Sequence, residues 1–358
     1  MDNNDYKTQL NNLLDLTIKE GASDLHISVN NYPTLRIVGR LVPIMKMKKL
    51  TPTDTQGLAL ALLTEAQYQK LLEKKEIDFS YNFQDRARFR VNAYFQRGTI
   101  SVALRLIPQK IRTVEELNLP SILHKFTQPQ QGFILITGPS GHGKSTTLAA
   151  LIDEINHTRT EHIITIEDPI EYVFEEDKSI IDQREVLHDT LSFTNALKAT
   201  FRQDPDVIMV GEMRDAESME IALRAAETGH LVFSTLHTNS ASQTIHRIVS
   251  AFPVEHQEQI RAQLGSALYG IISQRLIPRT SGGLIPACEV MFNTPAIANL
   301  IRENKIHEID FVIETSLEEG MISFNRALAE LVRRGEISLN NALSYSLDPK
   351  SLRKLMKK

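Results

Sequence analysis

Cysteine and aromatic residues are scarce in this sequence, and long apolar runs are missing from it. Its 358 residues include a single cysteine, Cys288, so neither an intrachain disulfide nor a zinc cluster of cysteines can form, and a reducing compartment fits this composition. Aromatic residues make up 6% and the net charge is −4, which argues against a protein that coats nucleic acid. No apolar run approaches the ~20 residues that a bilayer-spanning helix needs.

The remaining composition predicts a globular protein. Apolar residues make up 42% of the chain, and its length allows two domains with at least one sizeable core. The first ten residues, MDNNDYKTQL, are polar and acidic, unlike a signal peptide. We therefore expect a cytoplasmic protein that acts at the inner face of the membrane through a partner.

The N-terminal third has a mixed pattern of helices and strands. Helices are expected at 6–20 and between 53 and 76, and strands at 24–29, 34–38 and 78–107. A connector marked by prolines follows. We assign residues 1–108 to an N-terminal domain and 109–125 to the linker.

Beyond the linker, the pattern is that of an α/β domain, which we assign to residues 126–358. Helices alternate with apolar strands expected at 133–137, 162–166, 207–210 and 231–236. This alternation is typical of a parallel sheet. The last stretch, 255–358, is expected to be mostly helical.

The segment GPSGHGKSTT carries the most specific motif. It fits G-x-x-x-x-G-K-[ST], with an apolar strand before it and a helical pattern after it. In such a loop, backbone N–H groups and the helix N-terminus cradle a polyphosphate, the lysine adds a charge, and the next hydroxyl can ligate Mg²⁺. We predict that a nucleoside triphosphate and Mg²⁺ are bound by Gly138, Pro139, Ser140, Gly141, His142, Gly143, Lys144, Ser145 and Thr146. His142 occupies a variable position of the motif, where we expect little effect.

Two acidic residues follow apolar strands, where the ligand sites of α/β sheets form. Glu167 ends the segment IITIE, and Glu212 ends VIMVGE. Glycine stands where the second segment would usually carry its first acid, so we predict that Glu212 holds Mg²⁺, directly or through water. Glu167 is then the better candidate for activating the attacking water. The alternative for each is an acid that merely ends a strand.

Two histidines flank another expected strand, in GHLVFSTLHT. His237 follows the strand, where a γ-phosphate sensor would lie, whereas His230 precedes it. For both, a packed structural role stays open. A dinuclear metal site is not expected, because no second carboxylate or histidine lies at ligand spacing nearby.

An arginine-rich segment, DRARFRVNAYFQRGTISVALR, predicts a β-hairpin in the N-terminal domain. Apolar and polar residues alternate on both sides of a two-residue turn at Arg97. Arg90 then lies directly opposite Arg105, an arrangement that destabilises a ladder unless an anion binds there. The alternatives are a solvated basic face, or pairing of Arg90 with Asp78 or Asp85.

Four motifs in order resemble the secretion and type IV pilus ATPases. They are ITGPSGHGKSTTLAALID, HIITIEDPIEYVF, DPDVIMVGEMRD and GHLVFSTLHTNSA, and the resemblance covers nearly the whole chain. Near the N-terminus, GASDLHI and RFRVNAYFQRG resemble the PAS-like domain of these proteins. The resemblance implies an α/β fold, with a RecA-like P-loop NTPase domain after a smaller PAS-like α+β domain.

The resemblance also implies ATP as the nucleotide and a homohexamer, in which each N-terminal domain docks on the nucleotide domain of its neighbour. It matches Glu167 to the catalytic base and Glu212 to the Mg²⁺ ligand. It matches His230 and His237 to the histidine pair of one motif. The arginines matched to residues that reach the nucleotide phosphates are Arg90, Arg105 and, more loosely, Arg112.

Within the family, the resemblance implies the pilus-retraction motor, which disassembles a pilus by acting on an inner-membrane platform protein. Extension motors and type II secretion ATPases typically carry extra N-terminal sequence and a four-cysteine zinc element, which one cysteine cannot form. Residues 296–303, AIANLIRE, resemble a retraction motif with Ala298 in place of its arginine. An accessory retraction ATPase that works with a paralogue therefore stays open. So do a DNA-translocating ring and an ATP-holding module without turnover, although we expect no nucleic-acid partner.

Overall fold

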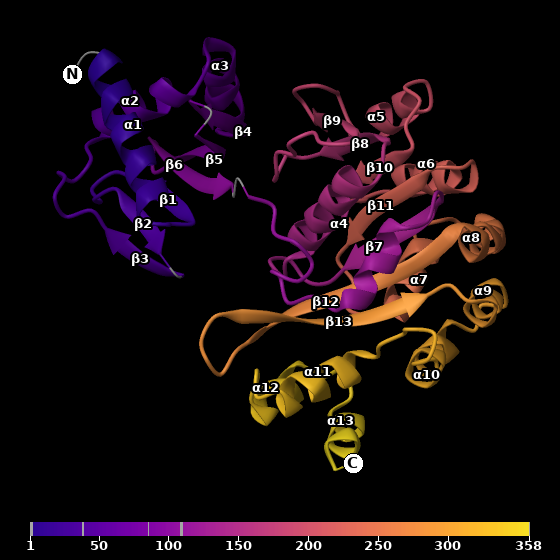
Figure 1. Ribbon diagram of the computed structural model, residues 1–358. Coiled ribbons are helices and arrows are strands. Elements are labelled where there is room, and N and C mark those ends of the chain that lie inside the picture. Colours follow the sequence, from indigo (N-terminus) through magenta and orange to yellow (C-terminus); the bar gives the residue numbers. More distant parts are fainter. Residues whose placement is uncertain (1–2, 38, 85, 108–109, 358) are drawn as a thin grey trace. The chain divides into compact units, whose positions relative to one another are not determined.

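The computed structural model describes residues 3–37, 39–84, 86–107 and 110–357, and the chain divides into two compact units (Figure 1). Unit 1 comprises Met1–Lys110 together with Pro169–Val173, and unit 2 comprises Ile111–Asp168 together with Phe174–Lys358. Val38, at the end of one expected strand, and Asp85, a candidate partner of Arg90, lie outside the described residues.

Unit 1 combines an antiparallel sheet with helices. Its strands have the order β3-β2-β1-β6-β5-β4, and each neighbouring pair is antiparallel. The strands are β1 (Asp24–Ile27), β2 (Thr34–Ile37), β3 (Arg40–Pro43), β4 (Glu76–Phe83), β5 (Ala87–Gln96) and β6 (Thr99–Ile107). The helices are α1 (Asn3–Lys19), α2 (Pro52–Leu62) and α3 (Glu65–Lys74). Every residue of β3 is exposed, and the sequence pattern does not predict this strand.

Local sequence explains where two of these helices begin. Thr51 and Asp54 form a capping box at the start of α2, and Thr64 and Gln67 form another at the start of α3. Along β5, buried residues alternate with partly exposed ones, as in a strand with one covered face. Helices and sheet share one apolar core, which includes Leu10, Leu14, Leu25, Leu58, Phe89, Val91 and Leu104.

Unit 2 is built on a mostly parallel sheet with the order β13-β12-β7-β11-β10-β8-β9. Only the β12–β13 pair is antiparallel among the paired strands described. The strands are β7 (Gly132–Thr137), β8 (His162–Glu167), β9 (Ile180–Glu185), β10 (Val207–Val210), β11 (Leu231–Leu236), β12 (Leu268–Pro278) and β13 (Leu284–Phe292). The helices are η1 (Ser121–Thr127), α4 (Lys144–Thr158), α5 (Phe193–Thr200), α6 (Ala216–Glu227), α7 (Ala241–Ser250), α8 (Val254–Ala267), α9 (Pro295–Arg302), η2 (Ile306–Glu308), α10 (Ile309–Thr315), α11 (Phe324–Arg333), α12 (Leu339–Tyr345) and α13 (Pro349–Met356).

Both faces of this sheet are covered by helices. Phe133 and Leu135 of β7 belong to a core that also contains residues of α5 to α10. Ile134 and Ile136 are equally buried, and they point to the other face because strand side chains alternate. Helix α4 contacts β7, β11 and η1 and lies outside that first core, so it covers the second face. The expected parallel strands and the α/β class are therefore confirmed.

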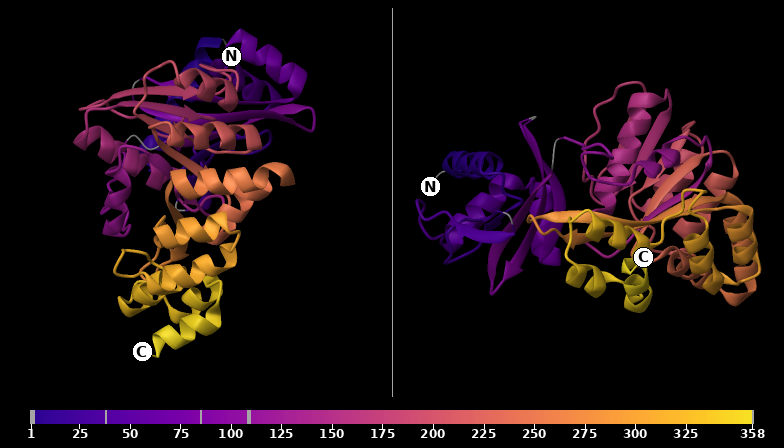
Figure 2. Two further views of the ribbon diagram at one scale, coloured as in Figure 1. Left: turned by 90° about the vertical axis from the view of Figure 1, so that its right-hand side faces the viewer. Right: turned by 60° about the horizontal axis from the view of Figure 1, so that its bottom comes forward.

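Residues 255–358 are mostly helical, as expected, but the expectation missed two strands. The strands β12 and β13 occupy the stretch between α8 and α9. Nearly all central residues of both strands are buried, so their sequence lacks the alternation that marks a half-buried strand. Helices α11 to α13 then pack along this hairpin (Figure 2), through a separate core that includes Ile277, Ile285, Phe324, Leu328 and Leu352.

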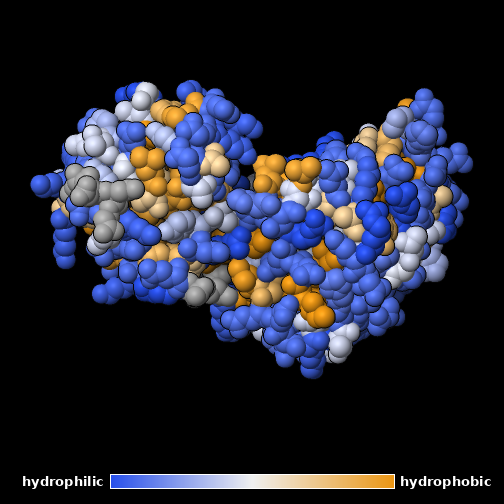
Figure 3. Space-filling view, turned by 90° about the horizontal axis from the view of Figure 1, so that it is seen from above, coloured by the Kyte–Doolittle hydropathy of each residue, from blue (hydrophilic) through white to orange (hydrophobic). Residues whose placement is uncertain are grey.

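Surface apolar residues are dispersed on the face shown in Figure 3, where small orange patches alternate with hydrophilic side chains. Within the described part of the chain, no helix has both the length and the apolar character that crossing a membrane requires.

Candidate active site

The P-loop joins the end of β7 to the start of α4, the strand, loop and helix order that its motif predicts. Gly138, Gly141 and Gly143 have φ angles of 148°, 76° and 80°, a region that favours glycine. A Cβ added at Gly138 would collide with the backbone oxygen of Gln274 on β12. Glycine is therefore needed at this position for the close approach of the loop to β12.

Lys144, the first residue of α4, lies across this loop and is only 7% exposed. Its ammonium group donates to the carbonyl oxygens of Gly138 at 2.9 Å and Pro139 at 3.0 Å. The same nitrogen lies 3.3 Å from Nδ1 of His237. The loop thus holds a positive charge beside the N-terminus of α4, where P-loops bind the β- and γ-phosphates.

Side chains from β12 and the loop fasten the P-loop in place. Gln274 donates through Nε2 to the His142 carbonyl oxygen at 2.9 Å and accepts through Oε1 from the Thr147 hydroxyl at 2.7 Å. The backbone N–H of Leu276 donates to Nδ1 of His142 at 2.9 Å. His142, for which we expected little effect, therefore anchors the loop through both its backbone and its side chain.

The chemistry around His142 favours the form that can accept this hydrogen bond. Burial lowers the pKa of His142, and the charges of Arg275 and Lys144 lower it further. A neutral imidazole has an unprotonated nitrogen, whereas both nitrogens of the charged form are donors. The P-loop is thus anchored by a histidine whose lowered pKa, caused first by burial, favours the accepting neutral form.

Glu167 lies at the carboxyl end of β8 and is 5% exposed. Its Oε1 accepts from the Thr165 hydroxyl at 2.7 Å and from Nε2 of Gln183 at 3.1 Å. A Cβ added at Gly211 would lie 3.9 Å from Cγ of Glu167 and 3.3 Å from the backbone oxygen of Ile166. Glycine at the position where an acid was expected therefore leaves room beside the Glu167 side chain.

Glu212, just after β10, lies in a chain of charged contacts at this same end of the sheet. Its Oε1 is 3.2 Å from Nε2 of His237, and its Oε2 accepts from Nε of Arg214 at 3.1 Å. Arg214 also lies 3.5 Å from Asp168, the residue after Glu167. The structure thus brings the predicted residues Lys144, His237 and Glu212 together.

The hydrogen bonds assign a tautomer to His237. The Lys144 ammonium can only donate, so Nδ1 of His237 accepts from it. The proton of the neutral ring is then on Nε2, which lies 3.2 Å from Oε1 of Glu212. His237 consequently links the P-loop lysine to the predicted Mg²⁺ ligand through one ring.

The residues predicted to hold Mg²⁺ provide the hard oxygen donors that this ion prefers. Ser145 follows Lys144 in the first turn of α4, and the Glu212 carboxylate is 26% exposed. Mg²⁺ is usually bound through one or two protein oxygens, waters and substrate phosphates, so two oxygen donors suit this mode of binding.

Within the described residues, no hydrogen bond or ion pair joins two further predicted residues, His230 and Arg112, to the P-loop. His230 precedes β11, at the opposite end of the strand from His237, about 20 Å away for six residues. Its Nδ1 lies 2.9 Å from the carbonyl oxygen of Ala225, and its ring packs edge-on against Phe201. Arg112 is an exposed residue of the segment before η1. His230 thus has the contacts of a structural residue in its own chain.

The arginine hairpin of unit 1 has the register that the sequence predicts. Arg90 of β5 is paired directly with Arg105 of β6, and the turn residue Arg97 has a φ of 48°. The cross-strand neighbour of Arg90 on β4 is Ser80, and Nε of Arg105 donates to Asp24 at 2.9 Å. Asp24 is a partner that the sequence did not indicate. The Arg105 side chain remains 69% exposed, which leaves most of its surface open to a ligand.

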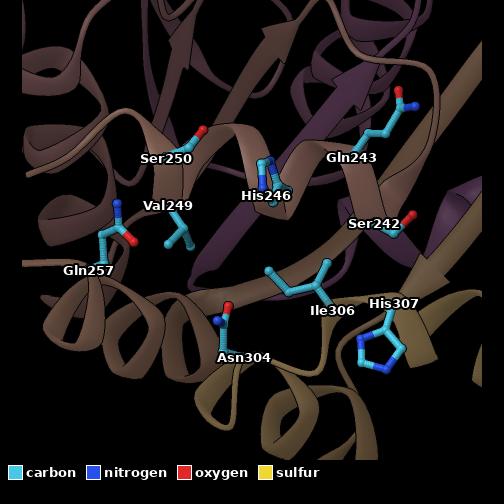
Figure 4. Close-up of a pocket in the computed structure, with 9 residues that line it drawn as sticks. All are labelled: Ser242, Gln243, His246, Val249, Ser250, Gln257, Asn304, Ile306 and His307. Carbon is cyan, nitrogen blue, oxygen red and sulfur yellow. The ribbon is translucent and has the colours of Figure 1, made fainter. Parts of the chain in front are cut away.

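A separate cavity of about 440 Å³ lies beside α7. Figure 4 shows side chains of α7 on one side of it and those of Asn304, Ile306 and His307 on the other. Its lining residues include none from the P-loop and neither Glu167 nor Glu212. The cavity is therefore distinct from the site described above.

A family model described as "Type II/IV secretion system protein" matches residues 2–345. The chain belongs to this family. It is 44% identical to the type IV pilus retraction ATPase PilT of Pseudomonas aeruginosa, over 95% of this chain and 98% of that protein. It is 41% identical to the type IV pilus ATPase PilU of the same species, over 96% of this chain and 90% of that protein.

Solved structures support the same conclusion. The crystal structure of the pilus retraction motor PilT with bound ADP matches with a TM-score of 0.90 and 48% identity, over 96% of this chain and 98% of that one. The ATPase DotB of Legionella pneumophila matches with a TM-score of 0.79 and 28% identity, over 92% and 93%. The predicted RecA-like ATPase architecture is therefore confirmed, and the chain is a nucleotide-binding P-loop ATPase of the pilus-retraction type.

The sequence did not indicate two glutamines that contact the site. Gln274 supports the P-loop from β12, and Gln183 contacts Glu167 from β9. Both lie on strands that were not expected, in stretches without a recognised spacing. Glutamine also has no titratable group that would single it out.

Proposed function

We propose that this chain is the motor of type IV pilus retraction and couples ATP hydrolysis at its P-loop to pilus disassembly. The observation that carries the proposal is the convergence of Lys144, His237 and Glu212 at the P-loop, in a chain that matches PilT over 98% of that protein. A relative with 48% identity has been solved with bound ADP, which supports a nucleotide in this site.

The residues of the site divide the work of hydrolysis. Lys144 and the N-terminus of α4 hold the phosphates and offset the charge of the transferring group. Ser145 and Glu212 would hold Mg²⁺, which would neutralise phosphate charge when bound. Glu167 accepts a proton from the attacking water. His237 connects the γ-phosphate region to Glu212.

The proposed assembly is a homohexamer whose nucleotide sites are completed by a neighbouring subunit. Residues 1–108 form the PAS-like domain, 109–125 the linker and 126–358 the ATPase domain. Arg90, Arg105 and Arg112 contribute charge to the phosphates. His230 is the second member, with His237, of the histidine pair in the family's motif. The partner is a PilC-type platform protein, and the motor acts at the cytoplasmic face of the inner membrane.

An accessory, PilU-like role is the second candidate, because the identity to PilU is nearly as high. In the motif AIANLIRE, Ile297 and Ile301 are fully buried, and Ala298 is 7% exposed. The polar residues of this motif are outside the core, where Nδ2 of Asn299 donates to Glu303 at 3.1 Å. The missing arginine therefore falls at a position that is buried in this chain, while the exposed polar residues of the motif are kept.

Two measurements test the proposal. The variant Lys144→Ala should lose ATPase activity by at least about a hundredfold, because the phosphates lose their fixed charge. A strain without this protein should become hyperpiliated, and a bald strain would indicate extension instead. Hyperpiliation that needs loss of a paralogue as well would favour the accessory role. ATPase activity of Lys144→Ala within a few-fold of the wild type would contradict the site itself.

A further inference from the structure

Gln183 contacts the proposed catalytic base from the edge of the sheet in unit 2. It lies on β9, which pairs in parallel with β8, and its register partner there is Thr165. Side chains at register partners share one face of a sheet, and Glu167, two residues after Thr165, lies on that same face. The structure thus places Thr165, Gln183 and Glu167 on one face, and both neighbours donate to Oε1 of Glu167, at 2.7 Å and 3.1 Å.

A second hydrogen bond sets the orientation of the Gln183 amide. Its Oε1 accepts from the backbone N–H of Phe174 at 3.0 Å. A backbone N–H can only donate, so the amide oxygen must face Phe174 and the NH₂ group must face Glu167. The donor side of Gln183 is therefore directed at the carboxylate by a group that does not titrate.

This arrangement suits a carboxylate that must be charged and held in one position. Hydrogen bonds to the charged form of an acid favour that form, and a base is competent only while it is charged. Small misplacements of a reacting group can cost about a hundredfold in rate. A hydrogen-bond donor to one oxygen of Glu167 favours the charged form of the carboxylate. It also holds the carboxylate in one orientation, so the direction of its other oxygen is set.

We propose that Gln183 is a positioning residue for the water-activating step, acting through Glu167. The inference rests on the proposed role of Glu167 as the base. Thr165 donates to the same oxygen from within β8, whereas Gln183 ties that oxygen to β9 and to the Phe174 backbone. Gln183 thus couples the base to the segment at which the chain re-enters unit 2.

The experiment uses the full-length protein and compares Gln183→Leu, Gln183→Glu and Glu167→Gln. Gln183→Leu removes the donor at similar volume, and we expect kcat to fall about tenfold or more, with KM for ATP changed less than about threefold. The acid limb of the kcat–pH profile should move upward by about half a unit or more, because the charged base loses a donor. Gln183→Glu, nearly isosteric, places a second carboxylate beside the first and should move this limb further.

Asp182→Asn is the matched control, because Asp182 lies on the same edge strand and pairs with His162, away from Glu167. It should leave kcat and the acid limb unchanged, so an equal loss in this variant would overturn the proposal in favour of general loosening of β9. If Gln183→Leu fails to fold, the kcat and the acid limb of Gln183→Glu test the proposal instead.

The outcomes separate this inference from the proposed function. Normal turnover and an unmoved acid limb in the Gln183 variants, with Glu167→Gln inactive, would overturn the positioning role alone. Normal turnover in Glu167→Gln would show that the base itself is misassigned. A raised KM with unchanged kcat would also overturn the inference, because Gln183 would then serve binding.

Discussion

Nε2 of His237 lies 3.2 Å from Oε1 of Glu212, so the histidine that follows β11 lies beside the acid that follows β10. Because Nδ1 of the same ring faces Lys144, the ring lies between the P-loop lysine and the proposed Mg²⁺ ligand. The variant His237→Ala should therefore lower kcat about tenfold to a hundredfold.

His237→Gln is the informative comparison, since its amide NH₂ can take the place of Nε2 beside Glu212. We expect it to retain more activity than His237→Ala in steady-state ATPase assays. Equal losses in both variants would mean that the contact with Glu212 is not what matters.

The two acids should differ in how their loss affects hydrolysis. Glu167→Gln should bind Mg·ATP and lose turnover by about two orders of magnitude or more, because the attacking water loses its base. Glu212→Gln should also raise the Mg²⁺ concentration needed for half-maximal activity. Titrating Mg²⁺ and measuring nucleotide affinity in both variants distinguishes them. If Glu167→Gln hydrolyses ATP normally, Glu212 becomes the next candidate for the base.

The arginines of unit 1 should act on a neighbouring subunit's nucleotide. Arg105→Ala should cost a large factor in turnover, as for a lost arginine finger, while the subunit stays folded. Folding is expected to survive because Arg105 is 69% exposed and Asp24 keeps a second contact, Arg36 at 3.6 Å.

A mixing experiment tests this action in trans. Arg105→Ala subunits have an intact P-loop, and Lys144→Ala subunits have intact arginines, so mixed rings should regain part of the lost ATPase activity. Mixed rings that form and stay inactive would indicate that the arginines act in cis or only structurally.

A buried acid beside the histidine motif should make stability depend on pH. Burial raises the pKa of Glu289 from 4.5 to about 7, and its Oε1 accepts from the N–H of Ala241 at the start of α7. The folded state therefore binds a proton that the unfolded state releases between about pH 4.5 and 7. The contribution of this group is present below that window and is lost as pH rises through it, by about 3 kcal/mol at most.

Glu289→Gln should remove this pH dependence while keeping an oxygen for Ala241. We expect the melting temperature of the variant, relative to the wild type, to rise between pH 5 and pH 8 in thermal scans. Glu318→Gln, at an exposed position, is the matched control and should show no such trend. A constant difference between Glu289→Gln and wild type across this range would refute the assignment.

Much of the nucleotide site could be predicted because local patterns carry it. The P-loop is one contiguous segment, and Glu167 and Glu212 each follow an apolar strand, a position that reaches the ligand edge of a parallel sheet. The pairing of Arg90 with Arg105 followed from alternation on both sides of a two-residue turn. These features depend on neighbours in the sequence, so the sequence specifies them.

The features that the sequence did not predict have two physical causes. Some strands are buried on both faces, and some contacts join residues that are far apart in the sequence. The sequence pattern does not indicate β12 and β13, because fully buried strands lack alternation. The contact of Arg105 with Asp24 joins residues 81 positions apart. No periodicity within either segment reports such a pairing.

The sequence by itself determined the chemistry: a phosphate-binding loop, acids at strand ends and a basic hairpin, each encoded by contiguous residues. Only the tertiary structure decided which side chains support them. Gln274 donates to the P-loop from β12, and Gln183 donates to Glu167 from β9. Both contacts form because the strand order in the sheet brings distant segments together. It also decided that the ring of His237, which the sequence puts at the ligand end of its strand, contacts Lys144 and lies beside Glu212. Contacts between side chains from separate strands depend on how those strands are aligned in the sheet, which no single segment specifies.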